Sequence, residues 1–231
     1  SPDGEQLAEI DLIEAIMASP YRSLLMYAET DSPGGDLLHT NSITYIDAKA
    51  AAGLPFAKAG QILLSMRNID TLAVLDPEAG TVTWAMRGPW HMQHDPDILE
   101  NGNLLLFDNK GDLAHGGKTR IMEFDPSDFG LVWEYPGEED ELLYTSVYGS
   151  QQRLANGNTL ISETNAGRIL EVNYAKEVVW EFQVPERTTS SQGIERATAI
   201  FATRYTEDEL QFEFGAETVG SRNERQARTV H

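Results

Sequence analysis

The chain has 231 residues, of which 41% are hydrophobic and 23% are charged. This composition is ordinary for one large globular domain or two small ones, and it excludes a fibrous or largely disordered chain. Acidic residues outnumber basic residues 37 to 17, and the resulting net charge of −20 repels phosphate backbones and anionic lipid surfaces. Binding to nucleic acid or to a membrane surface is therefore not expected.

Cysteine is absent, which excludes disulfides, thiolate nucleophiles and cysteine-based zinc sites. No apolar run reaches the roughly 18 residues of a membrane-spanning helix. The first residues, Ser1 to Gly4, lack both an initiator methionine and the basic-then-apolar pattern of a signal peptide. We expect no signal peptide in this chain, which reads as a processed or truncated piece of a longer protein.

Residues 1–36 form the first region of the chain, and their apolar residues recur at helical spacing. The apolar positions are Leu7, Ile10, Ile13, Ile16 and Met17. Asp11 is followed three positions later by Glu14, the spacing of a capping box. The pattern predicts one or two short helices that are inserted in the fold or cover one of its edges.

A repeat of nearly constant length follows, marked by Trp84, Trp133 and Trp180. Each tryptophan stands at the end of a segment that reads as strand, tight turn and strand, which is typical of antiparallel hairpins. Upstream of the second and third hairpins, Asn101-Gly102 and Asn156-Gly157 each predict a turn that opens another strand. Four short strands per repeat indicate a β-propeller blade.

The predicted fold is therefore all-β: about three propeller blades and one extra strand, behind a short helical segment. The blades span residues 37–88, 89–137 and 142–185, a partial strand spans 194–205, and 206–231 is a polar tail. Helical repeats are disfavoured because the segments are short, β-branched and punctuated by turns. Propellers carry about four to eight blades, so either the chain is a fragment or two copies form one ring.

Histidines mark the expected functional end of the blades, where innermost strands converge on a central channel. Aligning the repeats on their Asn-Gly turns places His39, His94 and Gly149 in one slot. Converging imidazoles can hold an anion, transfer protons or accept a group. The alternative is a structural role at the strand ends. His91 lies three residues before His94, but further ligands for a metal are not evident, so no metal site is predicted.

Arginines provide the second set of candidates. Arg120 and Arg168 share a repeat slot, where a guanidinium could clamp sulfate, phosphate or carboxylate. The alternative is a repeat-encoded salt bridge to a neighbouring blade, which fits Arg168 best. Arg67 is a further candidate at the end of a second strand. No phosphate-binding glycine loop, serine-hydrolase elbow or zinc-protease motif occurs.

These motifs together resemble the bacterial, nucleotide-independent arylsulfotransferase family over most of residues 37–186. The similarity rests on the order and spacing of several short segments, not on any single one. The segments are Asp36 to Ile43, Ile62 to Asp70, Trp90 with Gln93-His94, Phe107 to Asn109, Thr119-Arg120 and Gln152 to Leu160.

The resemblance implies half of a six-bladed propeller that moves a sulfo group from a phenolic sulfate to a phenol through a sulfo-histidine, with no cofactor. It places the catalytic residues at His39, His94 and Arg120. The substrate-binding candidates are Asn41, Arg67, His91 and Tyr148. It also implies a periplasmic or secreted protein.

One expected residue is missing. By resemblance, a nucleophilic histidine would stand around Ser146 to Ser150, and none is there. Either His94 takes that role, or the chain is a catalytically inactive propeller that binds a ligand or a protein. The expected partner is a small phenolic or aryl sulfate ligand, with a homo-oligomer or a missing propeller half completing the ring.

Overall fold

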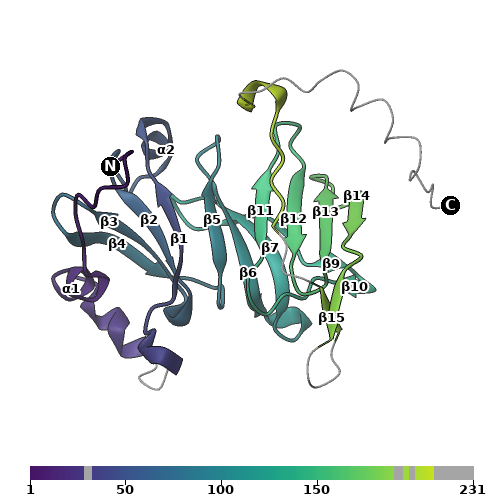
Figure 1. The fold of residues 1–231 in the computed structure, drawn as a ribbon, viewed down its shortest axis with the longest axis horizontal. Coiled ribbons are helices and arrows are strands. Elements are labelled where there is room, and N and C mark those ends of the chain that lie inside the picture. The colour runs from purple at the N-terminus through teal and green to yellow at the C-terminus, as the bar shows by residue number, and fades with distance from the viewer. Residues whose placement is uncertain (29–32, 190–194, 198–200, 211–231) are drawn as a thin grey trace.

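The computed structural model describes residues 1–28, 33–189, 195–197 and 201–210. Three four-stranded antiparallel sheets stand side by side in a row (Figure 1). In each sheet the strands follow chain order, so neighbouring strands are joined by hairpins. This is the arrangement of propeller blades, and the predicted all-β propeller fold is confirmed.

The three sheets are called blade 1, blade 2 and blade 3. Blade 1 contains β1 (Thr40–Tyr45), β2 (Ile62–Met66), β3 (Thr71–Asp76) and β4 (Thr81–Arg87). Blade 2 contains β5 (His94–Ile98), β6 (Leu104–Asp112), β7 (Lys118–Phe124) and β8 (Leu131–Tyr135). Blade 3 contains β11 (Ser150–Arg153), β12 (Thr159–Glu163), β13 (Arg168–Val172) and β14 (Val178–Gln183).

Smaller elements connect and flank the blades. The helices are α1 (Leu12–Met17), α2 (Ala48–Gly53) and the 3-10 turns η1 (Arg22–Tyr27), η2 (Pro33–Gly35), η3 (Arg67–Ile69), η4 (Leu113–His115) and η5 (Glu207–Glu209). The remaining strands form two short hairpins, β9 (Gly137–Glu138) with β10 (Glu141–Leu142), and β15 (Arg187–Thr189) with β16 (Glu195–Ala197). Helix α2, inserted between β1 and β2, was not predicted.

Alternating side chains of blade 2 build the cores on its two sides, because successive residues of a strand point to opposite faces. Leu104, Leu106 and Phe124 pack against Leu63 and Leu72 of blade 1. On the other face, Leu105, Phe107 and Ile121 pack against Ile161 and Leu170 of blade 3. Blade 2 is therefore covered on both faces.

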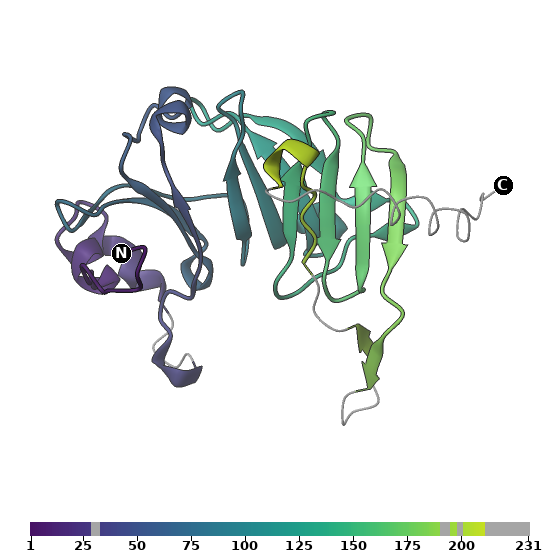
Figure 2. The same ribbon diagram turned by 45° about the horizontal axis from the view of Figure 1, so that its top comes forward.

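The predicted N-terminal helical segment covers the outer face of blade 1, as both views of the ribbon show (Figures 1 and 2). Helix α1 begins after Asp11, whose carboxylate accepts hydrogen bonds from the backbone N–H groups of Ile13 and Glu14. Ile16 packs with Met66, Ile69 and other apolar side chains of blade 1. The segment is thus an end cap on the row of blades.

The end of the chain departs from the expected strand over 194–205. Within the described residues, β16 is the one strand there, and it pairs with β15 in a hairpin outside the blades. Residues 201–206 have no strand assignment. Positions 194 and 198–200, and most of the predicted polar tail (211–231), lie outside the described residues.

Candidate functional site

The innermost strands β1, β5 and β11 begin at the same end of the three blades. Their first residues enclose a hollow of about 260 Å³. It is lined by His39, Asn41, His94, Asp95, Tyr148, Gly149, Ser150 and Phe201. The structure therefore brings together four residues that the sequence analysis singled out: His39, Asn41, His94 and Tyr148.

His94, the first residue of β5, is almost fully buried, with 8% of its surface exposed. Its Nδ1 lies 2.7 Å from Oδ1 of Asn109 and 3.2 Å from the carbonyl oxygen of Met92. Both neighbours are acceptors, so Nδ1 carries the hydrogen. Nε2 then holds the lone pair of the neutral ring and has no hydrogen-bond partner among the described residues.

Asn109 fixes this assignment because its own amide group is held on the other side. Its Nδ2 donates to the carbonyl oxygens of Thr145 and Tyr148, each at 2.7 Å. With both amide hydrogens used on blade 3, only Oδ1 is left to face His94. Asn109 thus connects the imidazole of blade 2 to the loop that enters blade 3. Asn109 belongs to one of the segments that carry the family resemblance, but no role was predicted for it.

Burial lowers the pKa of His94, because the charged imidazolium is poorly solvated there. The positive charges of Arg67 and His39 act in the same direction, while hydrogen bonds to Asn109 and Met92 oppose it. The ring is therefore neutral near pH 7, which is the form that a nucleophile or a proton acceptor needs.

His39 has a different environment. Its Nδ1 lies 2.5 Å from Oδ2 of Asp36, and the ring is half-exposed. Hydrogen bonds from the ring and from the backbone N–H of His39 lower the pKa of Asp36. A carboxylate at Nδ1 orients the ring, which is the arrangement of an acid–base histidine. Asp36 also belongs to one of the segments that carry the family resemblance, and no role was predicted for it.

Three lining residues other than glycine have left-handed backbone conformations. The φ angles are 49° at His39, 50° at Asp95 and 64° at Tyr148. Such conformations are uncommon outside glycine and are often found at functional sites. At Asp95 the register of β5 against β6 also shifts, as in a β-bulge, which re-aims the neighbouring side chains.

Gly149 was aligned with His94 in the sequence, but strand register gives that place to Ser150: His94 pairs with Phe107, and Ser150 pairs with the equivalent residue Ser162. Gly149 itself has a φ of 102°, and a Cβ placed there would lie 2.4 Å from the ring of Phe107. The hollow therefore receives a serine from blade 3 where blade 2 supplies a histidine. Tyr148, next to Gly149, contributes a half-exposed phenol that meets Phe201 edge-on, with ring centroids 6.4 Å apart.

Two polar residues lie close to the histidines from blade 1. Asn41 donates from Nδ2 to the carbonyl oxygen of Gln93 at 2.8 Å, and its buried Oδ1 has no partner in the described part of the chain. Arg67 donates to Oδ1 of Asn68 and lies 3.3 Å from the sulfur of Met92. No ion pair within 4.0 Å involves Arg67 in the described residues. Burial lowers the pKa of Arg67, and the charges of Asp70 and Asp36 oppose that shift. Arg67 is not among the residues that line the hollow.

Arg120 lies outside the hollow. Its Nε donates to Oδ2 of the buried Asp108 at 2.9 Å, and its Nη1 is 3.3 Å from Glu134. Arg168 makes the equivalent bond from Nε to Glu163 at 2.8 Å, between the same pair of strands of blade 3. Both salt bridges lie within one blade, whereas the alternative predicted from the sequence was a salt bridge to a neighbouring blade. The geometry gives Arg120 a structural partner where an anion clamp was expected.

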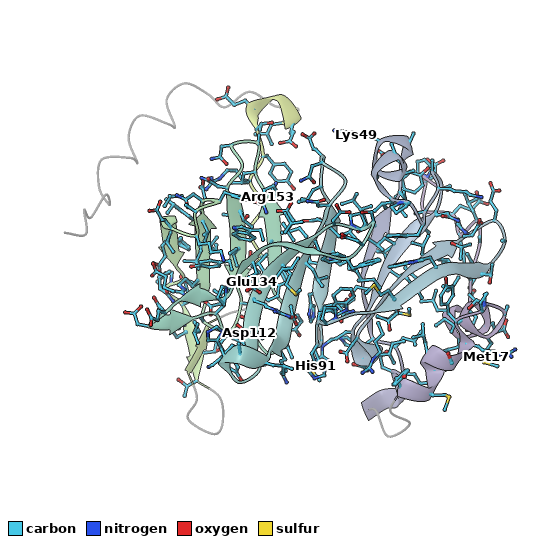
Figure 3. All side chains as sticks on the ribbon, turned by 180° about the vertical axis from the view of Figure 1, so that it is seen from behind. Met17, Lys49, His91, Asp112, Glu134 and Arg153 are labelled. Atoms are coloured by element: carbon cyan, nitrogen blue, oxygen red, sulfur yellow. The ribbon has the colours of Figure 1, made fainter. Side chains whose placement is uncertain are left out.

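His91 also lies apart from the hollow. Its Nδ1 is 2.9 Å from Oδ1 of Asp70, whose other oxygen pairs with Arg87. Figure 3 shows His91 and Asp112 near one end of the blades, with Lys49 and Arg153 near the other. The contacts of His91 fasten blade 2 to blade 1.

A pair of carboxyl groups on β5, Asp95 and Asp97, was not predicted. Gln151 of blade 3 donates from its backbone N–H to the Asp95 carboxylate and from Nε2 to Asp97. Burial, and then the charge of Asp95, raise the pKa of Asp97 to about 7. The alternating positions of Asp95 and Asp97 on an inner strand were the available sequence signal. The sequence does not show which side chains pack against them.

Two features are absent from the part of the chain that the structure describes. No group of three or more His, Asp or Glu side chains there is arranged to hold a metal ion. Nor is any helix in those ranges both long and apolar enough to cross a membrane.

Solved structures similar to this chain include several propellers at low identity. The WD40 β-propeller domain of Doa1 is 11% identical with a TM-score of 0.45, covering 69% of this chain and 48% of its own. A Bacteroides caccae protein of unknown function is 14% identical with a TM-score of 0.41, covering 68% and 51%. A catalytically inactive virginiamycin B lyase from Staphylococcus aureus with quinupristin is 13% identical with a TM-score of 0.41, covering 69% and 48%.

This chain thus spans about half the length of these solved structures. No curated protein matches it. The family described as Arylsulfotransferase (ASST) matches residues 2–185, which include all three blades and every residue of the hollow except Phe201. On that match, the chain belongs to the arylsulfotransferase family.

Proposed function

We propose that this chain contributes the active site of a propeller that transfers a sulfo group from a phenolic sulfate to a phenol, with His94 as the covalent acceptor. The observation that carries the proposal is the state of His94: it is buried and neutral, its hydrogen is held on Nδ1 by Asn109, and its Nε2 is unpartnered in the described residues. A neutral nitrogen lone pair beside an anion-sized hollow is what the first step requires.

In that first step, Nε2 of His94 attacks the sulfur of the bound aryl sulfate. The new N–S bond forms as the S–O bond to the ring breaks, and the donor leaves as a phenol or phenolate. In the second step, the oxygen of the acceptor phenol attacks the same sulfur, the N–S bond breaks, and the acceptor loses its proton. The two steps balance without a cofactor.

His39 is the residue of this proposal that moves the proton. Asp36 holds its Nδ1, so Nε2 can give a proton to the departing phenolate and take one from the acceptor. Arg67 supplies positive charge near His94, and Asn41 adds a polar group at the wall of the hollow. Arg67 thus replaces Arg120 as the anion-binding arginine.

The test is release of nitrophenolate from 4-nitrophenyl sulfate, with and without phenol, by the full chain. We expect phenol-dependent release that His94→Ala abolishes. His115→Ala is the matched control, because His115 lies in a surface turn and pairs with Asp112. Release that survives in His94→Ala, or that is absent from the wild-type chain in a completed ring, contradicts the proposal.

A second candidate function is a propeller that binds a ligand or protein without turnover. The lack of a histidine between Ser146 and Ser150 favours it, because the resemblance places the nucleophile in that region. Sulfate or vanadate separates the two candidates: a rise in Tm that is lost in Arg67→Ala supports an anion site, since a ligand that binds only the folded state stabilises it. No rise in Tm favours the binding module.

Two wider expectations stay within this proposal. A phenolic or aryl sulfate is the small-molecule partner, and further blades, or a second copy of the chain, complete the ring. Action in the periplasm or outside the cell is implied by the family resemblance alone. Gel filtration with light scattering tests the assembly, and cell fractionation tests the location.

A further inference from the structure

The hollow beside His94 is lined by two kinds of side chain. His39, Asn41 and His94 are polar and have the roles proposed above. Tyr148 and Phe201 form an aromatic pair, whose rings meet edge to face with centroids 6.4 Å apart and an interplanar angle of 86°. A sulfo group is an anion and is bound by polar side chains. The aromatic pair is therefore left to contact an apolar part of the ligand.

Both rings of the aromatic pair keep much of their surface in water. Phe201 is 62% exposed and Tyr148 is 53% exposed. A ligand that covers these rings removes apolar surface from water, which favours binding. Apolar side chains grouped in a hollow with a few polar groups are the usual lining of a small-molecule site, in which the polar groups set the orientation of the ligand.

The backbone of Tyr148 is fixed by its surroundings. Its φ is 64°, in the left-handed region that a residue with a side chain rarely adopts. Its carbonyl oxygen accepts a hydrogen bond at 2.7 Å from Nδ2 of Asn109, whose Oδ1 lies 2.7 Å from Nδ1 of His94. Backbone conformations of this kind persist where nearby contacts enforce them, and they cluster at ligand sites. Asn109 thus ties the aromatic pair to the proposed sulfo acceptor.

Phe201 is placed by residues 201–205, which lie beside β11 and β12 (Figures 1 and 2). The backbone N–H of Ala202, the next residue, donates to Oγ of Ser162 at 3.0 Å. Two residues further on, the side-chain amide of Gln152 donates to the backbone carbonyl oxygen and accepts from the backbone N–H. These hydrogen bonds anchor the segment on blade 3 and hold Phe201 at the hollow.

We propose that Tyr148 and Phe201 bind the aromatic ring of the substrate and so determine the selectivity of the site for aryl groups. This inference rests on the proposed function. The ring of the donor, and later that of the acceptor, packs on the aromatic pair by offset stacking or edge-to-face contact. Neither side chain takes part in making or breaking a bond. Phe201 lies outside residues 2–185, so the family match assigns it no role.

The kinetic consequence follows from where the ring contact acts. A contact that is equally strong in the bound substrate and in the transition state changes KM and leaves kcat nearly unchanged. Phe201→Ala should therefore raise KM for 4-nitrophenyl sulfate about tenfold, with kcat changed by less than about twofold. Phe201→Tyr keeps the ring and should restore the wild-type KM. Phe201→Leu keeps an apolar side chain without a ring and should give an intermediate KM.

Calorimetric titration of the full chain with 4-nitrophenol tests the ring contact without turnover. We expect the Kd to rise about tenfold in Phe201→Ala and in Tyr148→Ala, because each variant loses one aromatic contact. Any rise in Tm produced by sulfate should stay at its wild-type size, because sulfate has no ring. Tyr205→Ala is the matched control: Tyr205 lies in the same segment as Phe201, is 61% exposed, and lines a different hollow. Circular dichroism checks that each variant is folded.

The outcomes separate the ring site from the proposed function. The ring site is overturned if the wild-type chain does not bind 4-nitrophenol, if Phe201→Ala and Tyr148→Ala both keep the wild-type affinity, or if Tyr205→Ala loses as much. Each of these results leaves phenol-dependent transfer standing where it is observed. Loss of 4-nitrophenol affinity in both variants, together with no transfer by the wild-type chain, supports the ring site and contradicts the proposed function.

Discussion

The outer faces of blade 1 and blade 3 are the two ends of one row of sheets, and they are finished differently. On blade 1, α1 covers the sheet, and Ile16 is 1% exposed. On blade 3, Trp180 and Phe182 stay 44% and 45% exposed, and only residues 201–205 lie on the face. A blade sequence thus encodes one half of each interface, and the other half must come from a neighbouring element.

The largest difference in stability is expected between two tryptophan-to-alanine substitutions, one at a buried position and one at an exposed position. Trp133→Ala removes an indole that is 5% exposed, and we expect a loss of about 3–5 kcal/mol in the free energy of unfolding. Trp180→Ala should cost less than about 1 kcal/mol, since much of its surface is already in water. Urea denaturation followed by circular dichroism measures both, and equal losses would contradict the comparison.

The end cap of blade 1 should respond nearly as strongly. Ile16→Ala leaves a cavity between α1 and the sheet, which should lower the free energy of unfolding by about 2–5 kcal/mol. Leu7→Ala is the matched control, because Leu7 is 75% exposed and should change stability little. If both variants lose the same small amount, α1 does not seal the face.

A smaller, pH-dependent effect is expected within the closed interface of blades 2 and 3, where Asp97 meets Gln151. Burial raises the pKa of Asp97 to about 7, well above the usual range of an aspartate, so the folded chain holds this proton more tightly than the unfolded chain. Its contribution is therefore fully present below about pH 4 and is lost as the pH rises through about 7.

Asp97→Asn should flatten this dependence and raise stability at pH 8 by about 1 kcal/mol relative to the wild type. Thermal unfolding between about pH 4 and pH 8 measures the slope. An unchanged slope in Asp97→Asn would show that Asp97 is ionised throughout this range.

The smallest effect is expected at the surface contact between blades 1 and 2. Nζ of Lys49 lies 2.6 Å from Oε1 of Glu100, but the two side chains are 71% and 89% exposed. Solvent screens such a pair, so Lys49→Ala should leave the unfolding curve unchanged. A clear loss of stability would show that the blades are held together by more than their buried faces.

Much of the fold follows from the sequence because turns and alternation are local signals. Asn101-Gly102 and Asn156-Gly157 open strands as predicted, and the tryptophans lie in the outermost strands. Helix α2 was missed because its run of small residues, Ala48 to Gly53, has no apolar periodicity. The sequence of a single repeat also does not show that Trp180 is exposed while Trp133 is buried. The burial of each tryptophan depends on the blade that follows it.

The site was predictable in part for the same reason. His39 and His94 share a repeat slot, and the structure brings them to one hollow. The role of Arg120 was not predictable, because its carboxylate partner Asp108 stands on the neighbouring strand. Asn109 reaches its partners Thr145 and Tyr148 across the gap between blades, a contact that only the packed structure shows.

The two bonds from Asn109 to blade 3 also make the reactivity of His94 depend on a neighbouring loop. If Thr145 and Tyr148 moved away, the amide of Asn109 could rotate by half a turn and offer its NH₂ group to Nδ1. Among the described neighbours of Nδ1, the carbonyl oxygen of Met92, 3.2 Å away, would then be left to favour the hydrogen there. The tautomer of His94, and with it the lone pair on Nε2, is thus tied to the position of a loop in the next blade.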